Sequence, residues 1–598
     1  MTSNNIIEKP HKLFPLLWVT GILIAACVLL FYFLQSSQEF YYFYREQQQI
    51  FLFENDYILN LLKPIGGFAA MVGQWLVQFF VLPYMGAVIS TLLSLMAAIF
   101  LGLTLRKLDQ KNLWWISLTF LPFFLYNVCL QDVYVHYDGL VALTIGCICL
   151  WKYAMLPKDR WVFRLIGGIV LSLVLFYLAG SIAVLICLTM LLFDWLRKAP
   201  KAYLGVLPLI LVLLMGIIAV YYGWMVDYSY AFWTKGYCEY YFEPTFTHTL
   251  AWISIPILLL MAWLSARWEC KRAWIQPVLS LALLVLMFFG CQSLANAQKN
   301  HAYYTLLKQI HYADTEEWDK LTKVLDISAS NEVQMNYLNL GLAHEGRLLS
   351  DLFVYPQQNI NSLMTSYVQY TDMGVLMSRL YYQMGVIGAA QYQAFSSTVG
   401  ITYGNPSMTK LLIKTYLING TYQIAEKQIR LLEKSWYYAD WAKGMRKFLY
   451  NDDAVMADPE LGKMRLSLPD NDGYAMLYGP LVDLQTVMDA NPDNREAADY
   501  FIAMLLIAKD YNGINFFVDR YYGKGCMTTL PERLQEAVVA IHEHDPEYCR
   551  AHGVSEETIN RFSQFRQDVL TLRRSGATNM SRLAAGYGKT FWYYMVKN

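Results

Sequence analysis

The first stretch whose side chains suit chemistry is FLFENDYILNLLKP, residues 51–64. Glu54 and Asp56 stand two residues apart within it, among apolar and aromatic neighbours. Carboxylates accept protons and cations, so such a pair could act in acid–base catalysis or hold a metal ion. The elements on either side decide whether this pair faces water or lipid.

A second stretch, QDVYVHYDG at residues 131–139, combines two carboxylates with a histidine. These residues are Asp132, His136 and Asp138. If the preceding helix continues through the stretch, Asp132 and His136 lie one turn apart on one face. The two side chains could then share a divalent ion or a proton.

A third stretch, residues 227–248, combines carboxylates with many aromatic rings. Glu239 and Glu243 are four residues apart in it, and Lys235 precedes them. Aromatic faces beside carboxylates suit carbohydrate recognition, because apolar sugar faces stack on rings while hydroxyl groups bond to carboxylates. Trp and Tyr also gather at membrane–water interfaces without any ligand. Both interpretations of the rings stay open at this point.

Long apolar segments determine where these three stretches lie. A helix of about 20 apolar residues crosses the hydrocarbon core of a bilayer, because it satisfies its own backbone hydrogen bonds there. Almost all such segments precede residue 295, and we predict about nine spans from them. The spans are expected at residues 14–34, 84–105, 113–131, 137–151, 161–178, 180–195, 203–224, 249–266 and 274–294.

The apolar segment at residues 65–82 decides the orientation, because counting it as a span would reverse everything after it. Lys and Arg near span ends favour the cytoplasmic side. If this segment does not cross, only Arg45, Lys63 and Lys235 among the loop cations lie outside. We therefore predict a re-entrant or interfacial helix here and a cytoplasmic amino terminus. All three stretches then lie on the outer side of a cytoplasmic membrane.

After residue 295 the apolar runs give way to amphipathic helices with polar turns, so we predict two domains, residues 1–295 and 296–598. Turn residues recur at intervals of roughly 35 residues, a period typical of paired-helix repeats. The predicted fold is therefore all-α: a polytopic membrane domain followed by an α-solenoid outside the cytoplasm.

The clearest repeat is residues 406–434, PSMTKLLIKTYLINGTYQIAEKQIRLLEK, with two predicted helices joined at Gly420. It resembles tetratricopeptide repeats, in which a small residue such as Ala425 lets the helices approach closely. The side chains expected to face the core are Leu411, Leu412, Tyr416, Leu417, Ile424, Ala425, Ile429 and Leu432.

Composition excludes some classes of partner. The formal net charge is +0, without long basic or acidic blocks, so no nucleic-acid partner is expected.

The cysteines show no zinc-type spacing, although Cys526 and Cys549 could pair in an oxidising compartment. Coupled transport is disfavoured, because charged residues are almost absent from the middle of the spans.

The membrane half resembles the GT-C class of integral-membrane glycosyltransferases. The shared features are a cytoplasmic amino terminus, a long first outer loop with surface helices, an E-x-D sequence in that loop (Glu54, Asn55 and Asp56), and a carboxyl-terminal outer domain. In that class the loop carboxylates act as base or metal ligand, and the donor is a lipid-linked phosphosugar. The resemblance implies that Glu54 and Asp56 are the catalytic residues.

The same resemblance implies roles for the other loop residues. Asp132, His136 and Asp138 would hold a divalent metal ion or contact the acceptor. A fixed positive charge is needed near the leaving phosphate. The substrate-binding candidates are Arg45, Lys63, Lys235 and Glu239.

Two functions follow, and the sequence alone does not decide between them. The first is a glycosyltransferase with a lipid-linked sugar donor. The second is a non-catalytic, membrane-anchored tetratricopeptide-like scaffold that binds envelope proteins through its helical repeats. The overall arrangement is also similar to bacterial envelope membrane proteins to which no activity is assigned, so whether the chain is an enzyme stays open.

Overall fold

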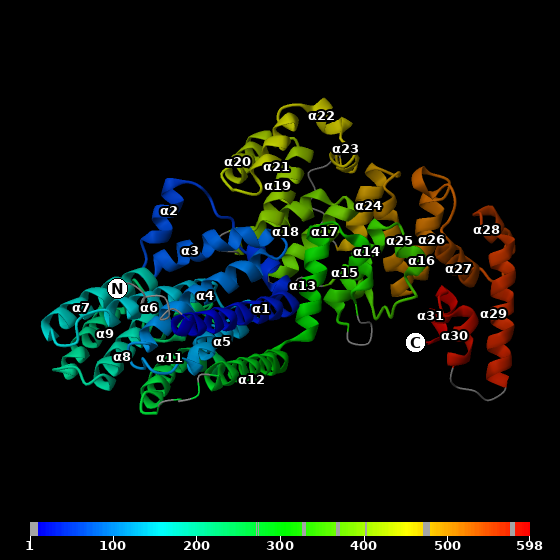
Figure 1. Ribbon diagram of the computed structural model, residues 1–598. Coiled ribbons are helices and arrows are strands. Elements are labelled where there is room, and N and C mark those ends of the chain that lie inside the picture. Colours follow the sequence, from blue (N-terminus) through cyan, green and yellow to red (C-terminus); the bar gives the residue numbers. More distant parts are fainter. Residues whose placement is uncertain are drawn as a thin grey trace, which may run out of the picture. The chain divides into compact units, whose positions relative to one another are not determined.

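The computed structural model describes residues 10–268, 270, 272, 274–325, 330–365, 371–400, 404–469, 479–574 and 580–597. These residues form helices without strands, apart from isolated bridges such as the one between residues 135 and 238 (Figure 1). The all-α prediction is confirmed. The chain divides into two compact units, the first formed by residues 1–46 and 51–300, the second by residues 47–50 and 301–598.

The first unit contains the apolar helices. Its elements are α1 (Pro10–Gln47), α2 (Asn55–Leu62), α3 (Gly67–Val77), η1 (Gln78–Val81), α4 (Met85–Leu105), η2 (Trp114–Phe120), α5 (Leu121–Cys129), α6 (Asp138–Ala154), α7 (Trp161–Ala179), α8 (Ile182–Leu196), η3 (Ala202–Gly205), α9 (Val206–Tyr221), α10 (Tyr228–Phe232), η4 (Thr234–Tyr237), α11 (Phe246–Ser265) and α12 (Ile275–Gln298).

Several of these helices could cross a membrane, which agrees with a membrane protein. Among the described residues, 6 segments are long and apolar enough by length and composition. They are Pro15–Gln47, Met85–Leu105, Trp161–Ala179, Ala202–Tyr221, Phe246–Ser265 and Ile275–Gln298. Shorter apolar segments are Gly67–Val81, Trp114–Cys129 and Ile182–Leu196. Each segment predicted to span therefore contains helix, although not every one has the length of a span.

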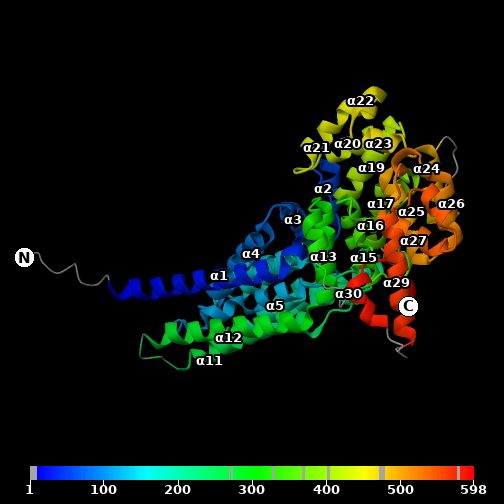
Figure 2. The ribbon, with the colours of Figure 1, turned by 90° about the vertical axis from the view of Figure 1, so that its right-hand side faces the viewer.

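The segment at 113–131 differs from the single helix predicted for it. It forms the 3-10 helix η2 followed by α5, with Pro122 in the first turn of α5. Proline fits that position because the first turn leaves its N–H groups without helical partners. Nearly all side chains from Trp115 to Cys129 are buried, and α11 and α12 both pack against α5 (Figure 2). This segment therefore lies inside the bundle, and its end positions the 131–139 stretch.

The second unit consists of shorter helices. They are α13 (His301–Asp314), α14 (Trp318–Lys323), α15 (Glu332–His344), α16 (Leu348–Asp351), η6 (Ile360–Ser362), α17 (Thr371–Met384), α18 (Ile387–Gly400), α19 (Pro406–Ile418), α20 (Tyr422–Leu432), α21 (Ala439–Met445), η7 (Arg446–Phe448), α22 (Asp452–Ala457), α23 (Leu461–Arg465), α24 (Pro480–Ala490), α25 (Arg495–Ala508), α26 (Tyr511–Tyr521), η9 (Gly525–Met527), α27 (Glu532–Ile541), α28 (Pro546–Ala551), α29 (Glu556–Arg574), η10 (Met580–Leu583), α30 (Ala584–Tyr587) and α31 (Phe591–Lys597).

The predicted hairpin at 406–434 is confirmed as α19 and α20. Asn405 caps α19 by accepting a hydrogen bond from the Met408 N–H at 2.9 Å, and Gly420 adopts φ +70° in the turn. That conformation favours glycine, because a Cβ atom is strained there. Most of the side chains predicted to face the core are buried, but Ile424 is 45% exposed, so its placement in the core was wrong.

Helix α25 gives the second unit a central core. Its side chains from Ala497 to Ile507 are all buried, and it packs against α16, α17, α24, α26 and α27. In a simple solenoid each repeat contacts only its neighbours in sequence. The contacts between α25 and α16 or α17 join segments far apart in the chain, which is a departure from that simple pattern. An apolar helix of this kind requires cover on every side.

A carboxylate buried in α24 predicts that the stability of the second unit depends on pH. Asp483 is 1% exposed, and neither of its oxygens has a hydrogen-bond partner. Burial raises the pKa of Asp483 to about 6. The folded state therefore binds the proton more tightly than the unfolded state, whose carboxyl pKa is about 3.9. The stabilisation is complete below that value and is lost as the pH rises through about 6.

We expect Asp483→Asn to remove this dependence, since an amide stays neutral at every pH. Relative to the variant, the wild-type chain should lose up to about 3 kcal/mol between acidic and mildly alkaline pH. Thermal unfolding followed at about pH 4.5 and at about pH 8 measures the difference. Identical pH slopes in both chains would contradict the assignment.

Candidate functional site

Two of the three stretches that contain candidate site residues contact each other through their backbones. Val135 and Cys238 form an antiparallel bridge between the 131–139 stretch and the 227–248 stretch. The His136 N–H donates to the Tyr237 carbonyl at 2.8 Å, and the Glu239 N–H donates to the Tyr134 carbonyl at 2.8 Å. This bridge fixes which side chains of the two stretches lie side by side.

The bridge brings the imidazole of His136 to the carboxylate of Glu239. His136 Nε2 lies 3.2 Å from Glu239 Oε1, and the two side chains are 41% and 48% exposed. Partial burial lowers the pKa of His136, but the hydrogen bond to Glu239 and the charges of Asp138 and Glu239 outweigh it and raise the pKa. The hydrogen bond from His136 lowers the pKa of Glu239. The carboxylate of Glu239 therefore stabilises the protonated form of His136 once it takes up a proton.

Arg45, near the end of α1, holds the 131–139 stretch in place. Its side chain is 8% exposed. Nη2 donates to the carbonyls of Leu130 at 2.8 Å and Asp132 at 2.7 Å, and Nη1 donates to the carbonyl of Val135. The predicted role of Arg45 as a phosphate contact does not fit this geometry, because these N–H groups are engaged by carbonyls inside the protein. The guanidinium instead shapes the turn that presents His136.

The carboxylates of the 131–139 stretch have different surroundings. The preceding helix ends at Cys129 and does not continue through residues 130–137, so the condition for Asp132 and His136 to share a helix face is not met. Asp132 Oδ1 accepts a hydrogen bond from the Tyr134 N–H at 3.0 Å, and burial raises the pKa of Asp132. Asp138 begins α6, and its Oδ1 is buried without a hydrogen-bond partner. Asp138 thus supplies negative charge next to His136.

Sequence reasoning missed Tyr126, which braces the same turn. Its hydroxyl lies 3.3 Å from the His136 carbonyl, which it can donate to. A Cβ atom at Gly139 would lie 1.7 Å from this hydroxyl, so only glycine leaves room for it. The glycine that directly follows Asp138 in HYDG was the available signal for this close approach.

The 51–64 stretch forms α2, where the predicted catalytic pair lies. Glu54 is the residue that precedes the helix and is half-buried, whereas Asp56 is exposed in the first turn. Carboxylates are favoured at that end by the helix dipole, which gives them an ordinary structural role. Lys63 ends the helix, and its exposed ammonium donates to Asn60 Oδ1 at 2.7 Å. The carboxylates that act most strongly on His136 are Asp138 and Glu239, neither of which belongs to α2.

Charged groups of the 227–248 stretch are largely engaged within it. Lys235, with a side chain 13% exposed, forms an ion pair with Glu243. Asp227 caps α10 by accepting hydrogen bonds from the N–H groups of Ser229 at 2.7 Å and Tyr230 at 3.1 Å. Lys235 is therefore committed to a neighbouring carboxylate and is a poor match for the phosphate role predicted for it.

Aromatic residues close in sequence to His136 and Glu239 pack against one another across the bridge. Tyr134 lies edge-on to Tyr241 with ring centroids 5.2 Å apart, and its centroid is 6.0 Å from that of Phe242. Tyr134 is 41% and Tyr241 70% exposed. These rings present apolar faces beside polar groups that can bond to hydroxyls.

The predicted metal site has no support from the arrangement of ligands. Within the described ranges, no group of three or more His, Cys, Asp or Glu side chains is placed to hold a metal ion. The site is instead a partly exposed histidine paired with the carboxylate of Glu239, with the negative charge of Asp138 also acting on it. Such an arrangement can accept, hold and return a proton.

Comparison with known proteins gives one result. A search of curated proteins and a search of solved structures each found no match. One family model covers residues 14–598 and so extends through both units. The chain belongs to this family of unknown function, DUF6057.

Proposed function

We propose that this chain is a multi-pass membrane glycosyltransferase of the GT-C kind, which transfers a sugar from a lipid-linked phosphosugar donor. The long helix α1 followed by the short helices α2 and α3 supports the proposal, since the GT-C resemblance implies surface helices in the first outer loop. The observation that carries it is the backbone bridge that pairs His136 with Glu239.

The proposed topology places this site on the outer side of a cytoplasmic membrane. About nine spans, with residues 65–82 re-entrant or interfacial, give a cytoplasmic amino terminus. The second unit, an array of tetratricopeptide-like hairpins in this proposal, then lies outside the cytoplasm, in the periplasm. The lipid donor reaches the site from the bilayer, and the rings of Tyr134 and Tyr241 contact the sugar.

His136 is the proton acceptor in the proposed reaction. The acceptor hydroxyl gives its proton to the neutral imidazole as its oxygen forms a bond to the anomeric carbon of the donor. The bond from that carbon to the phosphate oxygen breaks, and the lipid phosphate leaves with the electron pair. Glu239 stabilises the imidazolium that forms, which fits the raised pKa of His136.

The leaving phosphate requires positive charge, and Lys63 is the candidate cation that is exposed. Arg45 and Lys235 are engaged elsewhere. The described residues do not fit a bound metal ion, so no step of this reaction is assigned to one.

Replacing His136 by Ala is expected to lower the transfer rate by about 10²–10⁴-fold, because the proton then lacks an acceptor. Glu239→Gln should lower the rate less and move the acid limb of the pH–rate profile to lower pH, because Glu239 raises the pKa of His136. The measurement is sugar transfer by the purified chain in lipid, with a panel of lipid-linked phosphosugars and mass spectrometry of the products.

Glu243→Gln provides the matched control, because it removes a carboxylate of the same loop that pairs with Lys235 instead of His136. Full transfer by the His136 variant would overturn the assignment of the base. Transfer abolished by Glu54→Ala with Asp56→Ala, together with retained transfer by the His136 variant, would assign the base to α2.

A non-catalytic scaffold is the second candidate, and one surface of the second unit favours it. Tyr392, Phe395 and Val399 lie on one face of α18 and are 52%, 53% and 68% exposed. Exposed apolar stripes of this kind often mark protein-binding surfaces. A scaffold would tolerate the His136 and Glu239 substitutions and would lose its bound envelope protein when these three side chains are replaced by Ser.

A further inference from the structure

A groove lies near the carboxyl terminus, between α29 and the segment formed by η10 and α30. Its volume is about 710 Å³, within the range of small-molecule sites. The polar side chains that line it are Arg561, Gln564, Asp568 and Thr571 from α29, with Arg582 and Tyr587 opposite them.

The four polar lining residues of α29 form one continuous face, and Leu572 lines the groove beside them. Their spacing of three, four and three residues places them on the same side of the helix. Packing joins this helix to the other wall, because Phe565 of α29 lies 4.9 Å from Tyr587 and 5.8 Å from Trp592 between ring centroids. These aromatic contacts fix the two walls of the groove relative to each other.

The carboxylate in the groove is already engaged. Asp568 Oδ2 accepts a hydrogen bond from the Tyr587 hydroxyl at 2.8 Å. This bond joins the two walls. The hydrogen bond also disperses part of the negative charge of Asp568, so this carboxylate attracts the nearby cations less strongly.

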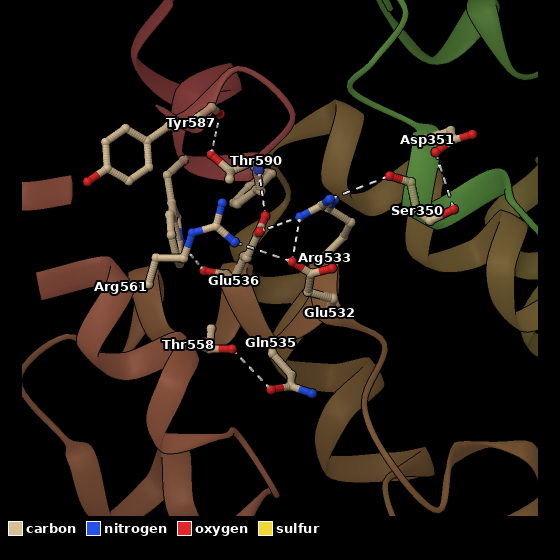
Figure 3. Close-up of polar contacts among 12 residues, drawn as sticks. Ser350, Asp351, Glu532, Arg533, Gln535, Glu536, Thr558, Arg561, Tyr587 and Thr590 are labelled. Carbon is tan, nitrogen blue, oxygen red and sulfur yellow. Dashed lines mark hydrogen bonds and ion pairs between the residues drawn. The ribbon is translucent and has the colours of Figure 1, made fainter. Parts of the chain in front are cut away.

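The guanidinium groups of Arg561 and Arg582 are held less firmly by other side chains. Figure 3 shows Arg561 reaching toward Glu532, with Nη1 3.6 Å from Oε1. Glu532 Oε1 also accepts from Arg533 Nη1 at 3.2 Å, so it does not depend on Arg561. Arg582 is exposed and forms no ion pair with the described residues. Arg561 and Arg582 thus both line a groove whose one lining carboxylate, Asp568, is hydrogen-bonded to Tyr587.

We infer that this groove binds a small molecule through a phosphate group, held between Arg561 and Arg582. Guanidinium groups match phosphate oxygens in pairs of parallel hydrogen bonds. A phosphate monoester carries nearly two negative charges at neutral pH, which matches two guanidinium groups better than a carboxylate does. Gln564 and Thr571 then bond to hydroxyl or ring oxygens of the same ligand. This site is separate from the proposed transfer site and does not depend on its activity.

The test is a calorimetric titration of the full chain in detergent micelles at constant ionic strength. The soluble probes are inorganic phosphate and glycerol phosphate, and a third arm uses vesicles that contain phosphatidic acid. Arg561→Gln and Arg582→Gln are each expected to weaken binding of the responsive probe by about tenfold or more, from the loss of one charge-assisted contact. Binding of a soluble probe identifies a soluble phosphate ester, and binding of the vesicles alone identifies a lipid headgroup.

Arg574→Gln is the matched control, because Arg574 is exposed on the same helix but does not line the groove. Its binding should equal that of the wild-type chain, and equal melting temperatures would show that all variants fold. The inference is overturned if no probe binds saturably, if both groove variants bind like the wild type, or if Arg574→Gln weakens binding as much as they do.

Discussion

Replacement of Arg45 by Met is expected to lower the free energy of unfolding of the first unit by about 3–5 kcal/mol, since several buried partners lose their donors at once. The guanidinium donates to the carbonyls of Leu130, Asp132 and Val135. Methionine fills a similar volume but leaves these buried acceptors without partners. The midpoint of thermal unfolding in detergent micelles measures the loss.

The same substitution should also loosen the pair of His136 and Glu239, because Arg45 holds the turn that precedes His136. Chemical modification of His136 is expected to become faster in the Met variant. Arg45→Lys is the control. It keeps the charge but lacks the planar guanidinium that bonds to several carbonyls, so it should lower the free energy of unfolding by less than Arg45→Met does. A Met variant that melts like the wild type would show that the turn does not depend on Arg45.

Replacement of Glu536 by Ala is expected to destabilise the second unit by a similar amount, about 3–5 kcal/mol, because it leaves a buried cation without its partner. Glu536 forms an ion pair with Arg533, and the side chains are 1% and 9% exposed. Its Oε2 also accepts from the Phe591 N–H at 2.7 Å, and its carbonyl accepts from Trp592 Nε1 at 2.7 Å. Loss of the carboxylate should release α31, which hydrogen exchange of residues 591–597 would detect.

Stability at this site should also fall with rising pH. Burial raises the pKa of Glu536 to about 7, although Arg533 lowers it. Because the folded pKa exceeds the unfolded value of about 4.3, the stabilisation is complete below that value and is lost through about pH 7. The double variant Arg533→Met with Glu536→Leu is the control and should cost less than Glu536→Ala, since no charge is left buried. A double variant less stable than the single one would contradict this account.

The hairpin at 406–434 could be predicted closely, because its signals are local. A glycine in the turn and apolar side chains at helical spacing both act within a few residues. The same reasoning misplaced Ile424, which is exposed although it follows the apolar pattern. Which side of a helix finds a neighbour depends on segments elsewhere in the chain, as α25 illustrates by packing against α16 and α17.

The candidate site shows more clearly what could not be predicted from the sequence. The sequence alone indicated the residue types, the helical class and apolar segments long enough for a membrane, because hydropathy and period are properties of consecutive residues. Only the tertiary structure decided that His136 meets Glu239, that Arg45 is buried against carbonyls, and that Asp132 lies in a turn. These relations are set by a bridge between residues 135 and 238 and by a side chain from α1. Contacts between positions so distant in the chain form only when the helices between them pack, and no local pattern records that packing.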